Sequence, residues 1–170
     1  MFGGHDGFDI TEKDPLRNTY MSSTSTETNN STYFSIKKAI DLASDTDYIE
    51  FDLAAMPGVT NGSLNTRLLT ACEERADSLA VLDLEGGYVP SHENTSIGSV
   101  ESTVTSLKDL SLNSSYGCAF YPWVKVRDQQ AGAILYVPPS VVALGTFSSA
   151  QRKSAVWFAP AGFTRGGLSE

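Results

Sequence analysis

The chain has 170 residues, 41% of them hydrophobic and 10% aromatic, and carries a formal net charge of −8. This length suits one domain, and the ordinary apolar content excludes collagen-like, disulfide-stapled and wholly disordered proteins. No apolar run approaches the roughly 20 residues that span a bilayer. No secretory signal is visible either, so we expect no membrane insertion and expect Cys72 and Cys118 to be reduced core thiols.

Charge is distributed unevenly along the chain. Residues 1–116 carry 7 basic and 18 acidic side chains, a net charge of −11, whereas residues 117–170 carry 5 basic and 2 acidic ones, a net charge of +3. The acidic part should repel nucleic acid and anionic membranes, so we expect neither as a partner. Two interpretations of the split stay open: copies of the chain meet acidic face to basic face, or local composition fluctuates without consequence.

Residues 1–32 show no sustained helical or strand period, and we expect them to form mostly loop. The polar run over residues 21–32 has too few apolar side chains to pack. From Phe34 to Ala43 apolar residues recur at helical spacing, which predicts a helix that begins after a cap at Ser31 or Thr32. We expect an α/β core over residues 33–116.

Two strands and two further helices are predicted in the rest of that core. Residues 48–53 predict a strand that ends before Pro57-Gly58, and Asn61 or Ser63 can cap the helix that follows. The apolar residues of that helix should face the core: Leu64, Leu68, Ala71 and Cys72. Residues 79–84 form an apolar run typical of a strand covered on both faces. Apolar residues at spacings of three and four predict a third helix: Ile97, Val100, Val104 and Leu107.

This alternation predicts an α/β fold, a layered sheet with helices on both faces, because crossovers between parallel strands need helices. Residues 117–170 should contribute a hairpin, a helix and a terminal loop. Residues 118–121 suit a strand that is interrupted at Pro122, which favours an edge position or a bulge over a central strand. Residues 123–126 and 133–137 then predict the hairpin, and Pro139 suits the first turn of the last helix.

Motifs for catalysis, metals and cofactors are nearly absent. Ser35 begins a Ser-x-x-Lys pattern that is short enough to occur by chance. His5 and His92 lie in polar loops without zinc-ligand spacing. Five carboxylates crowd one stretch without the turn of a calcium loop, and we interpret them as a solvated surface: Asp41, Asp45, Asp47, Glu50 and Asp52. Asp83 ends a buried strand, where α/β folds place functional residues. We therefore expect no catalytic residue, metal or cofactor.

The last third of the sequence resembles the contractile tail sheath protein of bacteriophages. The resemblance is carried by Tyr121-Pro-Trp-Val-Lys-Val-Arg-Asp128, by Leu135-Tyr-Val-Pro-Pro-Ser-Val-Val-Ala-Leu-Gly145 and by Arg152-Lys-Ser-Ala-Val-Trp-Phe-Ala-Pro-Ala-Gly-Phe-Thr-Arg-Gly-Gly-Leu168. The opening Phe2-Gly-Gly-His-Asp-Gly7 is similar to a Gly-Gly-x-Asp-Gly loop that lies earlier in such chains. Together these blocks are far more specific than each would be alone.

The resemblance implies a subtilisin-like α/β domain without protease activity, and a structural function in the virion. Subunits of this family stack as hexameric rings around a tail tube and contract on a baseplate signal, driving the tube through the bacterial envelope. The implied partners are other sheath subunits, the tail tube and the baseplate, and assembly takes place in the host cytoplasm. The resemblance also implies that this chain is an internal fragment of a longer subunit, and we expect the fragment alone to be a monomer.

Two kinds of residue are natural contacts in such an assembly. Trp123 and Trp157 offer large apolar areas, and we expect both in the core. Five cations are candidates for contacts with acidic helices of a neighbouring copy, with a merely solvated surface as the equal alternative: Lys125, Arg127, Arg152, Lys153 and Arg165.

Two other functions stay open. One is the sheath of a related contractile injection machine, although the Val-Pro-Pro-Ser block favours a phage. The other is an α/β hydrolase that uses Ser35, Asp52 and Asp83.

Overall fold

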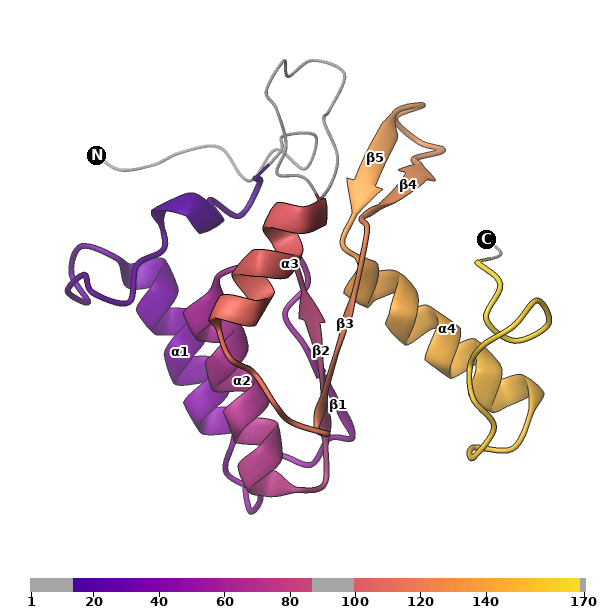
Figure 1. The fold of residues 1–170 in the computed structure, drawn as a ribbon, viewed down its shortest axis with the longest axis horizontal. Helices are drawn as coiled ribbons and strands as arrows, with labels where there is room; N and C mark the ends of the chain where they lie inside the picture. The colour runs from indigo at the N-terminus through magenta and orange to yellow at the C-terminus, as the bar shows by residue number, and fades with distance from the viewer. Residues whose placement is uncertain (1–13, 87–99, 169–170) are drawn as a thin grey trace.

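The computed structural model describes residues 14–86 and 100–168, which form a mixed α/β fold (Figure 1). Its elements follow in this order: a 3-10 helix Asn18–Tyr20, α1 Ser31–Ala43, β1 Leu53–Ala55, α2 Gly62–Arg75, β2 Leu79–Asp83, α3 Val100–Asp109, β3 Gly117–Phe120, β4 Val124–Arg127, β5 Ile134–Val137 and α4 Pro139–Lys153. Within the two described ranges, no helix combines the length and the apolar character needed to cross a membrane.

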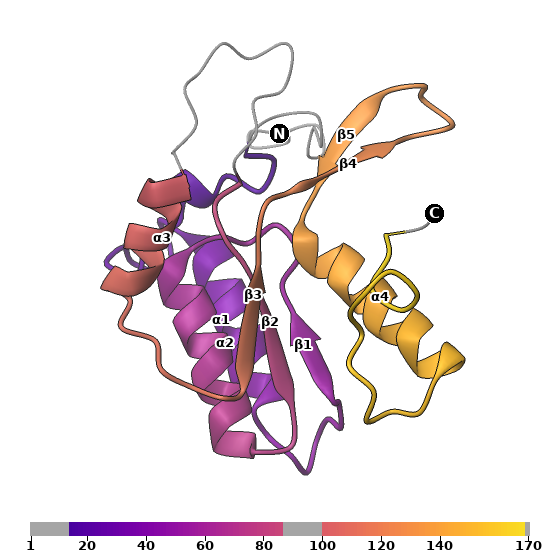
Figure 2. The same cartoon turned by 45° about the vertical axis from the view of Figure 1, so that its right-hand side comes forward.

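Strands β1, β2 and β3 form a parallel sheet in that order. The connection from β1 to β2 contains α2, the connection from β2 to β3 contains α3, and each leads to the neighbouring strand in the same direction across the sheet. Because such crossovers are right-handed, α2 and α3 lie on the same face of the sheet. Figures 1 and 2 show α1, α2 and α3 on that face, whereas α4 packs against β2 and β3 from the other. The predicted α/β class, with helices on both faces of the sheet, is confirmed.

The core lies between α1, α2 and the central strand. The predicted inward face of α2 is confirmed, since Leu64, Leu68, Ala71 and Cys72 are all buried. Tyr33 and Ile40 of α1 pack against them, and so do Ala80 and Leu82 of β2. Strand β2 is buried over four of its five residues, as expected for a central strand covered on both sides.

The approach of β3 to α2 depends on a glycine. At Gly117 an added Cβ would lie 2.4 Å from Cδ1 of Leu69, far inside van der Waals contact. Gly117 therefore allows the third strand to pair with β2 directly beside the core helix.

Three predictions near the start of the fold need correction. The cap of α1 is Asn30, whose side chain accepts a hydrogen bond from the backbone N–H of Tyr33, so Ser31 and Thr32 lie in the first turn. The polar run over residues 21–32 is not wholly outside the core, because Met21 is buried. The strand predicted over residues 48–53 is wrong, since β1 begins only at Leu53. Backbone bonds from residues 48 and 49 back to Asp45 form a turn there instead.

The third helix and the strand after it also differ from expectation. Val100 and Val104 of α3 are exposed, so the predicted apolar face is wrong for these two residues; the buried residue of α3 is Thr103, and Leu107 is half-buried. Ile97 lies outside the described residues. β3 belongs to the parallel sheet with β1 and β2, although the sequence groups it with the C-terminal hairpin. It is an edge strand, as Pro122 predicts.

The C-terminal elements follow the prediction closely. β4 and β5 pair as an antiparallel hairpin, with Lys125 opposite Tyr136. α4 begins at Pro139, and residues 154–168 form the expected terminal loop. Trp123 is buried with 8% of its surface exposed, but Trp157 is 80% exposed, so the expectation that both tryptophans lie in the core is wrong for Trp157.

A buried arginine holds the ends of α1 and α2 together. The side chain of Arg75 is 1% exposed and binds the Asp77 carboxylate through Nε and Nη2, each at 3.0 Å. Its Nη1 donates to the carbonyl oxygens of Ala43 and Ile49, and its guanidinium lies 4.3 Å from the ring centroid of Phe51. The hydrogen bonds from Arg75 lower the pKa of Asp77. Arg75 thus binds the carbonyl of Ile49 in the turn that replaces the first part of the predicted strand.

Replacement of Arg75 should destabilise the fold strongly. Arg75→Ala leaves two backbone carbonyls without a partner, so we expect a loss of about 2–4 kcal/mol in the free energy of unfolding, measured by urea denaturation. The matched control is Arg67→Ala, which removes an exposed pair with Asp41 and should cost at most about 1 kcal/mol. Equal losses in the two variants would contradict the importance of burial here.

Candidate functional site

The carboxyl edge of the parallel sheet is organised around Asp83, the last residue of β2. Its side chain is 1% exposed. One carboxylate oxygen, Oδ2, accepts hydrogen bonds from the Ser140 hydroxyl at 2.6 Å and from the Gly58 N–H at 3.0 Å. The other, Oδ1, accepts one from the Ser140 N–H at 2.9 Å. The carboxylate thus joins β2 to the loop after β1 and to the first turn of α4.

This arrangement explains how α4 begins. Pro138 precedes the helix and contributes no side-chain cap, and Pro139 has no N–H to donate. The N–H of Ser140 is therefore the first donor of the helix, and Asp83 caps it from another element. The positive end of the helix dipole also favours a carboxylate at this position.

The loop after β1 is shaped to reach the same carboxylate. Gly58 has φ +80, a left-handed conformation that favours glycine. An added Cβ at Gly58 would lie 2.9 Å from Cδ1 of Leu16. On the other side, Nδ2 of Asn65 in α2 donates to the backbone oxygen of Asp83 at 3.0 Å. Since Ser140 is fully buried, this cluster connects elements and offers no group to a solvent-borne substrate.

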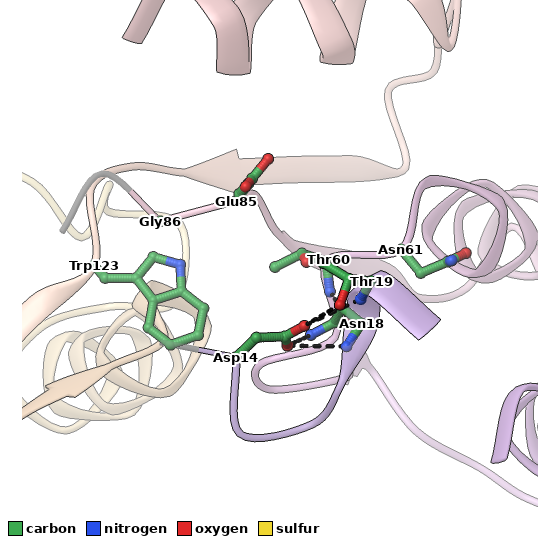
Figure 3. Close-up of a pocket in the computed structure, with 8 residues that line it drawn as sticks. All are labelled: Asp14, Asn18, Thr19, Thr60, Asn61, Glu85, Gly86 and Trp123. Atoms are coloured by element: carbon green, nitrogen blue, oxygen red, sulfur yellow. Dashed lines mark hydrogen bonds between the residues drawn. The ribbon is translucent and has the colours of Figure 1, made fainter. Parts of the chain in front are cut away.

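A pocket of about 240 Å³ opens at the same edge of the sheet (Figure 3). Its lining comes from the 3-10 helix, the loops after β1 and β2, and the start of the hairpin: Asp14, Asn18, Thr19, Thr60, Asn61, Glu85, Gly86 and Trp123. Nε1 of Trp123 donates to the carbonyl of Leu84 at 2.9 Å, which holds the indole against the loop after β2.

The polar groups of this pocket are largely engaged with one another. Both carboxylate oxygens of Asp14 accept backbone N–H bonds, from Asn18 at 2.9 Å and Thr19 at 3.0 Å. The Asn18 amide bridges onward to the Gly58 carbonyl and the Thr60 N–H, each at 2.8 Å. Burial alone would raise the pKa of Asp14, but the bonds from Thr19 and Asn18 outweigh it and lower that pKa. Asp14 therefore stabilises a loop and is a poor general base near neutral pH.

The residues that motivate a hydrolase do not converge. Asp83 binds Gly58 and Ser140, whereas Ser35 is exposed on α1. Asp52 lies just before β1, at the amino edge of the sheet, and Asp83 lies at the carboxyl edge. His5 and His92 lie outside the described residues.

The acidic stretch from Asp41 to Asp52 is a solvated surface, as the sequence predicts. All five of its carboxylate residues are exposed. Across the part of the chain that the structure describes, no three His, Cys, Asp or Glu side chains are grouped to hold a metal ion.

The two cysteines are free thiols. Cys72 is buried in the core and Cys118 is half-buried on β3. Burial raises the pKa of both thiols, so the reactive thiolate is scarce at neutral pH.

Four of the five cations expected at intermolecular contacts line one groove of about 850 Å³ between the β4–β5 hairpin, α4 and the terminal loop. Lys125 and Arg127 come from β4, and Arg152 and Lys153 from the last turn of α4. We call this feature the cationic groove. All four side chains are exposed, and none of them forms an ion pair with another described residue. Among the residues that the structure describes, no carboxylate contributes to the lining.

Arg165, the fifth cation, is engaged within its own loop. Its guanidinium lies 4.7 Å from the ring centroid of Phe158, which in turn stacks on Trp157 at 4.3 Å. The cation thus supports an exposed aromatic surface and does not line the groove.

Sequence reasoning missed the partner of Asp83. A signal was present, because Pro138 and Pro139 at the start of the helix provide no side-chain cap, so the first N–H group of the helix needs an acceptor from elsewhere. An aspartate at the end of an otherwise apolar buried strand must likewise find donors. Only the tertiary structure, which brings β2 and α4 together, shows that the aspartate accepts the hydrogen bonds that the start of this helix donates.

A scan against models of known protein families finds no match to this chain, and a search of curated proteins finds none either. The function must therefore be argued from the residues and their geometry.

Removal of the Asp83 carboxylate should disconnect α4 from the sheet. For Asp83→Ala we expect a loss of about 3–5 kcal/mol in the free energy of unfolding, because three buried donors lose their acceptor. Asp83→Asn is the matched control, since it keeps the shape and one acceptor oxygen, and it should cost less. Urea denaturation of both variants measures the difference. A loss below about 0.5 kcal/mol for Asp83→Ala would contradict the role assigned to this residue.

Proposed function

We propose that this chain is part of a structural subunit of a contractile bacteriophage tail sheath. The observation that carries the proposal is the exposure of the apolar side chains in the most specific sequence block, residues 152–168. Trp157 is 80% exposed, Phe163 is fully exposed, and Val156 and Leu168 are also largely exposed. A monomeric protein rarely presents so many large apolar side chains in one short segment, so they indicate contacts with other molecules.

The other two blocks support the same proposal through the shape they give to the surface. The Tyr-Pro-Trp block leads into β4, and the Val-Pro-Pro-Ser block joins β5 to α4. Two successive prolines restrict the backbone at this junction, and the bonds from Ser140 to Asp83 fix the start of the helix. The start of α4 is thus held against β2, and the hairpin that leads into it projects beyond the end of β3 (Figures 1 and 2).

The parallel sheet with helices on both faces is compatible with a subtilisin-like domain, and we propose that relationship for the fold. In this function the protein turns over no substrate. Copies stack as hexameric rings around a tail tube, and contraction follows from two alternative packings of the same subunits. The partners are other sheath subunits, the tube and the baseplate, and the location is the virion after assembly in the host cytoplasm.

Electron microscopy of the complete subunit that contains this sequence tests the proposal directly. Negative staining should show tubes or stacked rings, because the exposed apolar and charged surfaces offer contacts to neighbouring copies. Dispersed monomers under every assembly condition would contradict the proposal.

The two tryptophans should separate assembly from folding. Trp157→Ala should change the free energy of unfolding by no more than about 1 kcal/mol, because it removes mainly one stacking contact. The same variant should reduce tube yield. The matched control, Trp123→Ala, empties a buried site and should cost about 3–5 kcal/mol. Thermal or urea melts measure stability and sedimentation measures assembly; normal tube formation by Trp157→Ala would remove this side chain from the interface.

A further inference from the structure

An acidic surface lies where α1 and α2 end. We call it the acidic end, and it consists of seven exposed residues: Asp45, Asp47, Glu50, Asp52, Glu73, Glu74 and Asp77. The cation among them, Arg75, is buried and bound to Asp77. The other six carboxylates have no ion-pair partner among the described residues. The acidic end therefore presents a strong negative charge to solvent.

The cationic groove lies in another part of the molecule. Figures 1 and 2 show the β4–β5 hairpin and α4 across the sheet from the layer that α1 and α2 form. The ends of α1 and α2 point away from the hairpin in both views. The groove and the acidic end of one molecule thus face different directions and are both open to a neighbour.

We propose that the acidic end of one copy of this chain docks in the cationic groove of the next. The inference rests on the proposed function in one respect, namely that copies of the chain meet in an assembly, and it adds the surfaces through which they meet.

Two cationic grooves repel each other, and so do two acidic ends. The contact is therefore heterologous, with a different surface from each partner, and such contacts propagate into rings or helical rows.

Exposed apolar side chains on the two surfaces support this occupant as well as charge does. Tyr48 lies among the carboxylates of the acidic end and is 70% exposed. The groove has an apolar part formed by Val126, Val142 and Leu168 beside its four cations. An aromatic anchor in an apolar pocket, surrounded by opposite charges, is the usual arrangement of a strong contact. A nucleic acid is the less suitable occupant, because the chain as a whole has a net charge of −8.

Zero-length cross-linking of the complete subunit that contains this chain tests the proposal. A carbodiimide joins amines to carboxylates in contact, and a mixture of ¹⁴N- and ¹⁵N-labelled protein distinguishes links between copies from links within one. We expect mixed-isotope links from Lys125 or Lys153 to carboxylates of the acidic end, and their loss at high salt. Mixed links only to other carboxylates, or no mixed links at all, would overturn the proposal. So would binding of a short DNA duplex in place of these links.

Charge reversal gives a second test that does not depend on cross-linking. One variant carries Lys125→Glu with Arg152→Glu, and the other carries Asp47→Lys with Glu50→Lys; all four side chains are exposed, and a thermal melt checks that both variants fold. Each variant alone should lose at least tenfold in its association constant for self-association, measured by analytical ultracentrifugation. A mixture of the two should recover association, because each altered surface then finds its complement. Failure of this recovery would overturn the proposal.

The two proposals fail in different ways. If the complete subunit forms tubes and the charge reversals have no effect, the proposed docking is wrong and the sheath function stands. If the reversals behave as expected and the complete subunit never forms tubes or rings, the docking stands and the sheath function falls.

Discussion

The fold depends most on one buried carboxylate, because Asp83 receives donors from three different parts of the chain. It accepts the Gly58 N–H and both donors of Ser140, while its own backbone oxygen accepts from Asn65. A buried carboxylate is costly unless its acceptors are filled, so the loop after β1, the central strand and α4 must occupy one relative arrangement. This constraint orients α4 and, with it, the face that carries the hairpin and the cationic groove.

Arg75 imposes a comparable constraint at the opposite edge of the sheet. By binding two backbone carbonyls and Asp77, it gathers the ends of α1 and α2 and the acidic loop between α1 and β1. The two edges therefore use the same principle with opposite charges, since each buries one ionic group and satisfies it with hydrogen bonds from several segments. The interior is thereby fixed, and the remaining charges and aromatic rings are left on the surface.

That surface carries the functional argument. The terminal loop exposes Trp157 and Phe163, four cations share one groove, and the acidic residues gather at the ends of α1 and α2. The pocket at the carboxyl edge, where an α/β enzyme would hold its substrate, has polar groups that are mostly bound to one another. Contact with other molecules is therefore what we propose as the work of this chain.

The sequence by itself determined the α/β class, the buried faces of α2 and β2, the hairpin and the start of α4, because each depends on local periodicity or on proline. It also singled out the cations that the groove brings together. Only the tertiary structure decided that Asp83 caps α4, that Arg75 is buried and that Trp157 is exposed. These facts depend on which distant segments meet. Local pattern cannot distinguish a core tryptophan from a surface one, nor a turn held by a distant arginine from a strand, as residues 48–52 illustrate.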